Sequence, residues 1–399
     1  MGLFDWFDKR NKEAQKIPEE IKAQLNLLRQ ADPEFQSLSD KQLMLLIQQA
    51  MEMEATQANV PDKASIERLS AEECGAIGNQ LLELGRWQEA ESWIINALEK
   101  SENTRDYLNQ CRAYTLLGSL CYRRGEFPKA MKLLKYALEL SEQFGLRREK
   151  GMIYDEIGTA YNTQGQYADS IECHKMSISI IEELDENACV AYGNLGKSLF
   201  AYGDIQRATE AYEQALILNL KIGRENGAAI QYGNLGAIFA QQGLLDRAQE
   251  MFRKALAIHE KLGDQESMAR QYYNLGTSYG EQGKLDQAIK TLNNALEINA
   301  KIGNESVVAQ IYCTLATFYN IKGDIAYTLD FYNKSLNIAG RIGDNKTSAT
   351  TYFNLGILHR DDIGDANQAR QHFEKAKALF EMLGLSEDAQ RVARELRSL

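Results

Sequence analysis

The stretch AIQYGNLGAIFAQQGLLDRAQEMFRKALAIHEKLG, residues 229–263, contains the pattern that decides the fold. Its second half has apolar residues at helical spacing, at Ala248, Met251, Phe252, Ala255, Leu256 and Ile258. Gly243 separates this run from the one before it, and glycine ends helices because it accepts the left-handed conformation. The stretch therefore predicts two helices, over about 229–240 and 245–261.

The same pattern recurs along the chain at intervals of 38 or 40 residues. The anchor of each unit is a small residue: Gly78, Gly118, Gly158, Gly196, Gly236, Gly276, Ala316 and Gly356. A second glycine follows seven or eight residues later, and small residues follow at twelve or thirteen and at nineteen or twenty. Small residues in register allow helices to approach closely. Eight such units predict an all-α fold, a right-handed α-solenoid superhelix of about eight helix pairs.

The flanking sequences predict helical caps at both ends. Ser70 and Glu73 have the spacing of a capping box that opens the first repeat, and Ser386 is expected to be the N-cap of a last helix. The expected order is an amphipathic tail at 1–16, a helical cap or effector segment at 17–69, eight repeats at 70–385 and a capping helix at 386–399.

Composition disfavours several classes of protein. With 45 Lys and Arg against 56 Asp and Glu, the net charge is −11, whereas a nucleic-acid binder usually has a basic face. No apolar run reaches the length of a transmembrane helix, and the N-terminus lacks the features of a secretory signal. The six cysteines include no Cys-x-x-Cys pair and are expected to be free thiols in the cytoplasm.

Motifs for catalysis are missing from the sequence. The four histidines, at 174, 259, 359 and 372, have no metal-site spacing. Neither a Gly-x-Ser-x-Gly elbow nor a phosphate-binding Gly-Lys-Ser/Thr loop occurs. We therefore expect a protein that is not an enzyme and needs no cofactor or metal.

The third repeat departs from the pattern. Ser170, His174 and Ser177 replace the usual alanine, aromatic residue and alanine, and the next interval shrinks to 38 residues. One interpretation is a shortened loop near residues 184–188. The other is a local change of the superhelix that divides its groove into two halves.

The recurring Leu-Gly, Tyr/Phe, Gly, Ala, aromatic, Ala signature over about residues 71–385 resembles the tetratricopeptide repeat. The 40-residue period resembles the extended-helix type of the Leu-Gly-Asn-repeat (Pins-type) adaptors and the kinesin light chains. The former likeness rests on Tyr192-Gly-Asn-Leu-Gly, Tyr232-Gly-Asn-Leu-Gly, Tyr273-Asn-Leu-Gly and Phe353-Asn-Leu-Gly. The resemblance implies an interaction protein.

Asparagine occupies four of the eight positions that lie two residues before the anchor: Asn194, Asn234, Asn274 and Asn354. Asparagine is a mediocre helix former, so stability alone does not explain it there. On first helices that line a concave surface, its amide can donate to and accept from the main chain of an extended peptide. The resemblance implies the same role. Alternatively, each amide bonds a neighbouring helix and fixes repeat geometry.

Neighbouring side chains are expected to give selectivity. Glu156 would favour basic ligand groups, Lys197 and Arg270 would favour acidic ones, and Tyr273 adjoins Asn274. The predicted function is a non-enzymatic adaptor that binds a protein or peptide in the concave groove. One alternative is a peptide-controlled regulator of Rap type whose N-terminal helices act on an effector. Another is a self-assembling scaffold, a homo-oligomer in which the groove takes the N-terminus of a second copy.

Overall fold

The fold is known from a computed structural model that describes residues 69–181 and 188–399. These residues contain 17 α helices and no strand. They fall into two compact units, with the boundary between Leu120 and Cys121. The tail predicted at 1–16 and nearly all of the segment predicted at 17–69 lie outside the described residues, as does most of the loop near 184–188.

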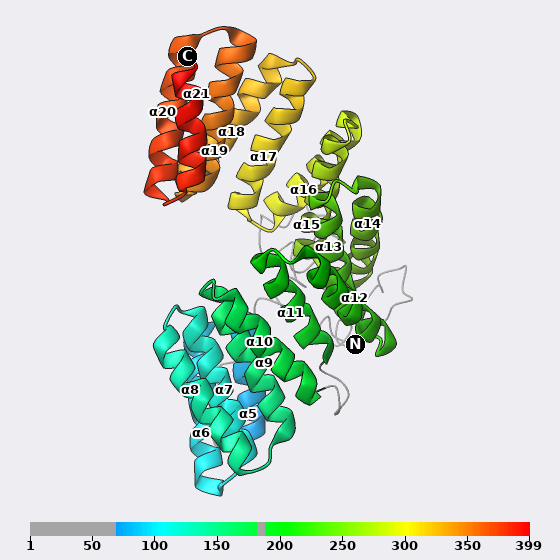
Figure 1. Cartoon of the computed structure of the whole chain (residues 1–399), viewed down its shortest axis with the longest axis vertical. Coiled ribbons are helices and arrows are strands. Elements are labelled where there is room, and N and C mark those ends of the chain that lie inside the picture. Colours follow the sequence, from blue (N-terminus) through cyan, green and yellow to red (C-terminus); the bar gives the residue numbers. More distant parts are fainter. Residues whose placement is uncertain (1–68, 182–187) are drawn as a thin grey trace, which may run out of the picture. The chain divides into compact units, whose positions relative to one another are not determined.

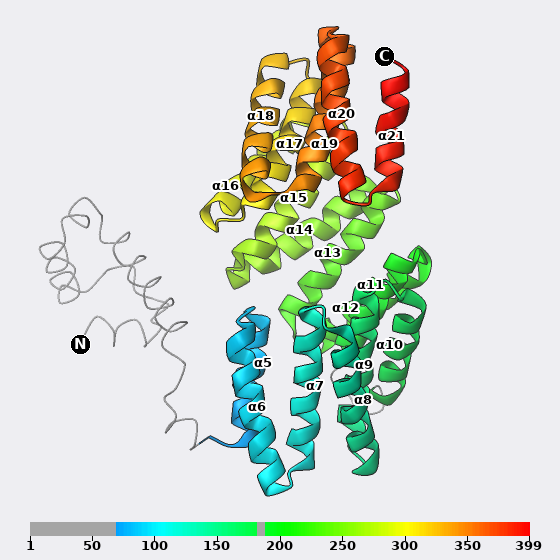
Figure 2. The ribbon, with the colours of Figure 1, turned by 90° about the vertical axis from the view of Figure 1, so that its left-hand side faces the viewer.

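The helices pair as the repeat predicts, and within each unit successive helices run side by side in opposite directions (Figures 1 and 2). Seven pairs lie within one unit: α5 (Ala71–Glu83) with α6 (Trp87–Thr104), α9 (Arg147–Thr163) with α10 (Tyr167–Ile181), α11 (Ala188–Tyr202) with α12 (Ile205–Lys221), α13 (Glu225–Gln241) with α14 (Leu245–Leu262), α15 (Gln265–Glu281) with α16 (Leu285–Lys301), α17 (Glu305–Ile321) with α18 (Ile325–Ile342), and α19 (Asn345–Leu358) with α20 (Ala366–Met382). The boundary between the units falls within α7 (Tyr107–Arg123), which α8 (Phe127–Gln143) follows in the chain. A π-helical turn, η2 (His359–Ile363), follows α19, and α21 (Ser386–Arg397) follows α20. The prediction of an all-α solenoid of helix pairs is confirmed.

The anchor glycine is explained by the side chain opposite it. A Cβ on Gly236 would lie 2.5 Å from the ring of Phe252, sixteen residues later on α14. Real Cβ atoms do not approach so closely, so the bulky residue requires a glycine in the partner helix. In the third repeat His174 takes the place of the aromatic residue and lies 2.7 Å from a Cβ on Gly158.

Helix ends follow the sequence signals with one exception. Gly243 has φ 73°, the left-handed conformation expected of a helix terminator. At the start of α5, Ser70 Oγ accepts from the Glu73 N–H at 3.2 Å, and the Glu73 carboxylate accepts from the Ser70 N–H at 2.8 Å. The prediction for Ser386 was wrong. It is the first helical residue, because Leu385 has the non-helical conformation of the N-cap and supplies no side-chain bond.

In two repeats a cation in the last turn of the second helix forms an ion pair with the first helix of the same pair. Lys261 Nζ, near the end of α14, contacts both carboxylate oxygens of Glu225 at 2.6 and 2.7 Å. Glu225 begins α13, the first helix of the same pair. Arg341 and Glu305 form the same link at 2.9 Å in a later repeat. The ion pair thus joins the two ends of a repeat.

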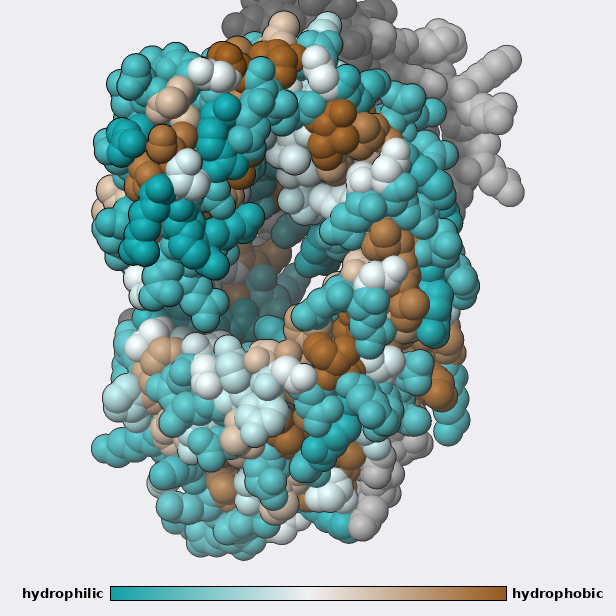
Figure 3. All heavy atoms as spheres, turned by 45° about the horizontal axis from the view of Figure 1, so that its top comes forward, coloured by the Kyte–Doolittle hydropathy of each residue, from teal (hydrophilic) through white to brown (hydrophobic). Residues whose placement is uncertain are grey.

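Each unit has its own apolar core. In the first unit Leu82, Trp93 and Ile94 are buried, and in the second Phe252 and Phe373 are among the largest fully buried side chains. The face shown in Figure 3 is mostly hydrophilic, with hydrophobic residues in small separate groups. Within the described ranges, none of the helices is both long and apolar enough to cross a membrane.

Candidate functional site

A groove of about 530 Å³ runs along α11 and α13 in the second unit. Its walls come from these two first helices, from the end of α12 and from the residue that precedes α13. The volume lies within the range of ligand pockets, roughly 300–1,000 Å³. Three predicted site residues line it: Asn194, Lys197 and Asn234. The structure thus brings three of the predicted residues together on two first helices, and their role in binding stays a prediction.

The other predicted residues lie outside this groove. The Glu156 carboxylate on α9 accepts from the Tyr122 hydroxyl at 3.0 Å. The exposed Arg270 on α15 donates from Nη2 to Ser267 Oγ at 3.0 Å. Both side chains therefore have partners within their own unit.

Tyr273, Asn274 and Asn354 also lie outside the groove. The Tyr273 hydroxyl is 3.4 Å from Thr314 Oγ1, and Asn354 Nδ2 is 3.6 Å from Cys313 Sγ. Asn274 is half-buried on α15. The helix α15 is the first helix of the repeat that follows the α13–α14 pair, so Asn274 continues the asparagine column one repeat beyond the groove.

Both asparagines of the groove donate a hydrogen bond from the amide nitrogen to a side-chain oxygen of the protein. Asn194 Nδ2 donates to Asp155 Oδ2 at 2.9 Å, and Asn234 Nδ2 donates to Gln231 Oε1 at 3.2 Å. The orientation of the Asn194 amide follows from its partner, because the carboxylate oxygen of Asp155 accepts the hydrogen bond and the amide nitrogen donates it. Neither Oδ1 atom has a hydrogen-bond partner among the described residues. Each amide nitrogen thus contributes to structure, as the alternative interpretation holds, while each carbonyl oxygen remains an available acceptor.

Buried glutamines behind the asparagine column were missed by the sequence interpretation. Gln231 and Gln271 lie five residues before the anchors of consecutive repeats and are buried. A Cβ on Gly193 would lie 3.2 Å from Gln231 Nε2, and one on Gly233 would lie 3.2 Å from Gln271 Nε2. These glycines therefore make room for the glutamine of the next repeat. Only two repeats carry the glutamine, so the column did not stand out.

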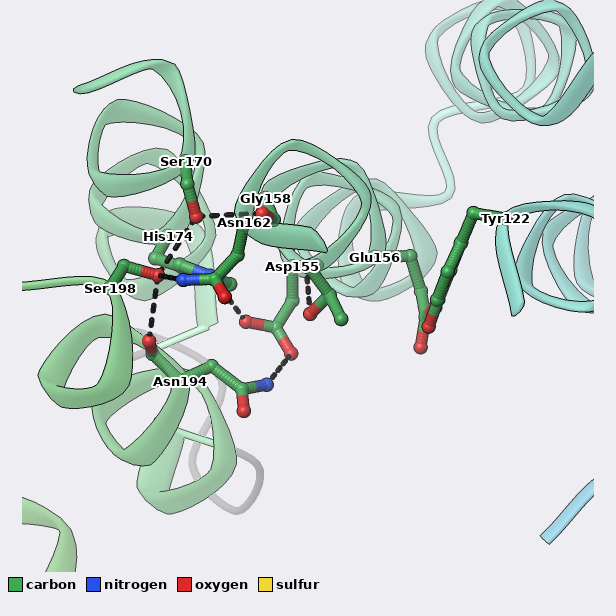
Figure 4. Close-up of polar contacts among 10 residues, drawn as sticks. Tyr122, Asp155, Glu156, Gly158, Asn162, Ser170, His174, Asn194 and Ser198 are labelled. Atoms are coloured by element: carbon green, nitrogen blue, oxygen red, sulfur yellow. Dashed lines mark hydrogen bonds and ion pairs between the residues drawn. The ribbon is translucent and has the colours of Figure 1, made fainter. Parts of the chain in front are cut away.

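Next to the groove, the unusual third repeat forms a polar cluster with the fourth (Figure 4). His174 on α10, with 1% of its side chain exposed, is joined through Nδ1 to Asp155 Oδ1 on α9 at 2.7 Å. The other oxygen of the same carboxylate holds Asn194 on α11. One carboxylate thus links three helices from two repeats.

Serines complete this cluster. Ser170 Oγ donates to the Gly158 carbonyl at 2.6 Å and lies 2.8 Å from Ser198 Oγ. Asn162 Nδ2 donates to Ser198 Oγ at 2.8 Å (Figure 4). The replacement of alanine by serine at position 170 is therefore matched by hydrogen bonds, as a buried hydroxyl requires.

The chemistry available to the histidines is limited. In the portion that the structure describes, His174 has no hydrogen bond to a serine, so the cluster lacks the nucleophile–base pair of a hydrolase. Burial lowers the pKa of His259, and burial with the nearby His359 lowers the pKa of His372 to about 4. Residues 69–181 and 188–399 contain no group of three side chains that could hold a metal ion.

Comparisons with solved structures support the fold alone. The apo form of RapI is 15% identical and has a TM-score of 0.64, over 82% of this chain and 96% of RapI. A Rap protein complexed with competence and sporulation factor is 15% identical, with a TM-score of 0.51, over 82% of this chain and 97% of that one. A signal-transduction ATPase with a tetratricopeptide repeat sensor, from Pyrococcus horikoshii, is 18% identical with a TM-score of 0.66, over 84% of this chain and 53% of that one.

The sequence comparisons identify the family. None of the curated proteins matches the chain. The profile of the tetratricopeptide repeat matches four stretches: residues 69–143, 150–218, 228–301 and 307–382. These stretches cover most of each helix pair and contain all three predicted residues of the groove. The chain belongs to the tetratricopeptide repeat family.

Proposed function

We propose that the protein is a non-enzymatic adaptor that holds an extended peptide, or the tail of a partner protein, in the groove between α11 and α13. One observation carries the proposal. Asn194 and Asn234 occupy equivalent positions in consecutive repeats, line the same groove and each keep a carbonyl oxygen available. An extended peptide offers main-chain N–H groups along its length, which are the donors that such acceptors need.

The contacts of these asparagines would supply affinity rather than selectivity. A carbonyl oxygen that accepts from a main-chain N–H does not distinguish one side chain from another. Asp155 and Gln231 hold the two amides, so little side-chain freedom is lost on binding. Asn274 would extend the row to α15. Cytoplasmic localisation belongs to the same proposal.

The structural neighbours are in keeping with a peptide ligand. One Rap structure contains competence and sporulation factor, and another, a conjugation regulator from a plasmid, contains the Phr* peptide. Their likeness to this chain also favours a second candidate, a peptide-controlled regulator in which residues 17–69 act on an effector. Removal of residues 1–68 separates the two functions. An adaptor would keep its complete activity, whereas a regulator would keep peptide binding and lose its output.

The test uses the full chain and fluorescein-labelled random dodecapeptides, with binding measured by fluorescence anisotropy. The variant is N194A/N234A. The control is N293A/N333A, which removes two exposed asparagines from the second helices α16 and α18. Two hydrogen bonds of about 0.5–1.5 kcal/mol each predict a loss of roughly 5- to 100-fold in affinity. Unchanged affinity in a variant with a normal circular dichroism spectrum would contradict the proposal.

A further inference from the structure

The groove between α11 and α13 carries charge of one sign. Lys197 on α11 and Arg224, the residue that precedes α13, both line it and are exposed. Among the residues that the structure describes, no aspartate or glutamate lines it. This is notable in a chain with a net charge of −11. A sequence interpretation had no reason to choose Arg224, because it lies between two helices.

Neither cation is neutralised within the described ranges. Lys197 forms no ion pair there, and the only polar contact of the Arg224 side chain among the described residues is from Nη1 to Cys189 Sγ at 3.6 Å. The carboxylate next to Arg224 in the sequence is Glu225, and both of its oxygens are held by Lys261. The ion pair that joins the ends of this repeat therefore keeps Glu225 from neutralising Arg224.

A buried amide lies beside Arg224, whose main-chain N–H donates to the Asn219 carbonyl at 2.9 Å. Asn219, at the end of α12, is 3% exposed and lines the groove. Its Nδ2 donates to the Ala215 carbonyl at 2.7 Å, while its Oδ1 lies 2.0 Å from the place of a Cβ on Gly227. Glycine at this position therefore makes room for the Asn219 amide.

We infer that the groove binds a peptide with an acidic residue, whose carboxylate lies between Lys197 and Arg224. This inference rests on the proposed function and adds the class of ligand. Asn194 and Asn234 would accept from the main chain, while the two cations select the side chain. Charge-assisted hydrogen bonds to a carboxylate are about twice as strong as neutral ones. We therefore expect an acidic residue to improve affinity by about tenfold over its uncharged amide.

The experiment measures selectivity separately from binding. The probes are fluorescein-labelled dodecapeptide libraries with an amidated C-terminus and one central position fixed as Glu, Gln or Lys. The full-length protein should bind the Glu library about tenfold more tightly than the Gln library, and about 500 mM NaCl should reduce this difference. A Gln library with a free C-terminus distinguishes a terminal carboxylate from an acidic side chain as the bound group.

Three variants test the residues. K197Q/R224Q should bind the Glu and Gln libraries equally, and K197E/R224E should prefer the Lys library. The control K290Q/R370Q makes the same changes at exposed cations on α16 and α20 and should keep the tenfold preference. N194A/N234A should weaken binding of all libraries equally.

Two results would overturn the inference in distinguishable ways. If the unmodified protein binds all three libraries equally while N194A/N234A binds them more weakly, the peptide groove stands and the acidic selectivity is wrong. If the folded protein binds none of the libraries at about 1 mM, both the selectivity and the proposed function are wrong.

Discussion

Replacement of Asp155 by alanine tests the polar cluster shared by the third and fourth repeats. The change removes the acceptor of two hydrogen bonds, at 2.7 Å to His174 Nδ1 and at 2.9 Å to Asn194 Nδ2. Each buried group left without a partner costs about 1–3 kcal/mol. His174 is almost fully buried and bears the full cost, whereas Asn194 is half-buried and bears less. We expect a loss of about 2–4 kcal/mol in the free energy of unfolding.

The assay is urea unfolding followed by circular dichroism, combined with hydrogen exchange to locate the effect. Because repeats open locally, exchange should rise in α9–α11 and stay unchanged in α17 and α18. The matched control is Asp330→Ala, which removes an i,i+4 pair with Lys334 whose side chains are 52% and 48% exposed. Such a surface pair contributes about 0.5 kcal/mol or less. Equal losses in the two variants would refute the reasoning, because burial would then make no difference.

Three further predictions concern other parts of the second unit. Gly236→Ala should cost about 1–3 kcal/mol in urea unfolding, since its Cβ would overlap the Phe252 ring. Burial lowers the pKa of His372 to about 4, so its imidazole binds a proton less readily in the folded state than in the unfolded state. The contribution of His372 to the free energy of unfolding should therefore be largest above about pH 6.5. It should fall by about 1–2 kcal/mol towards pH 4, once solvent screening is allowed for. Urea titrations of His372→Gln should show no such fall. Arg360 pairs with Glu395 of α21, so Arg360→Ala should speed hydrogen exchange in that helix.

Each of these predictions has a control. Gly340 is helical with no atom within 4 Å of its would-be Cβ, so Gly340→Ala should stabilise the protein by up to about 1 kcal/mol. Destabilisation by both glycine changes would contradict the packing argument. For His372, the same pH dependence in the glutamine variant would show that another group titrates. Arg394→Ala, at an exposed position of α21, should leave exchange unaltered; an effect equal to that of Arg360→Ala would assign it to helix propensity instead.

The period of the sequence predicted the helix pairs because each anchor column reports a contact within one repeat. Gly236 and Phe252 lie sixteen residues apart, and both belong to the pattern. The asparagine column recurs with the same period, and two of its members line the groove, although its role in binding stays a prediction. The orientation of their amides was not predictable. Asp155 and Asn194 are 39 residues apart, on helices of different repeats, and no periodic column records such a pair.

The charged part of the groove escaped prediction for a related reason. Arg224 was overlooked because it lies outside the periodic helical positions, although Lys197 was found on its helix. Glu156 and Arg270 were selected by charge and column alone. The structure instead gives them Tyr122 and Ser267 as partners, contacts that depend on packing rather than on spacing.

The cluster around Asp155 has a consequence for how this chain tolerates rearrangement. Repeats of the same length can be duplicated, deleted or exchanged as long as each repeat fits its neighbours. The third repeat is different, because its Asp155, which holds His174 through one carboxylate oxygen, accepts through the other from the asparagine of the repeat that follows. A shuffled chain that places after it a repeat without this asparagine, such as the first, second or seventh, would leave the Asp155 carboxylate with one of its two partners. The third repeat should therefore be inherited and engineered together with a following repeat that carries the asparagine, as a single block of four helices.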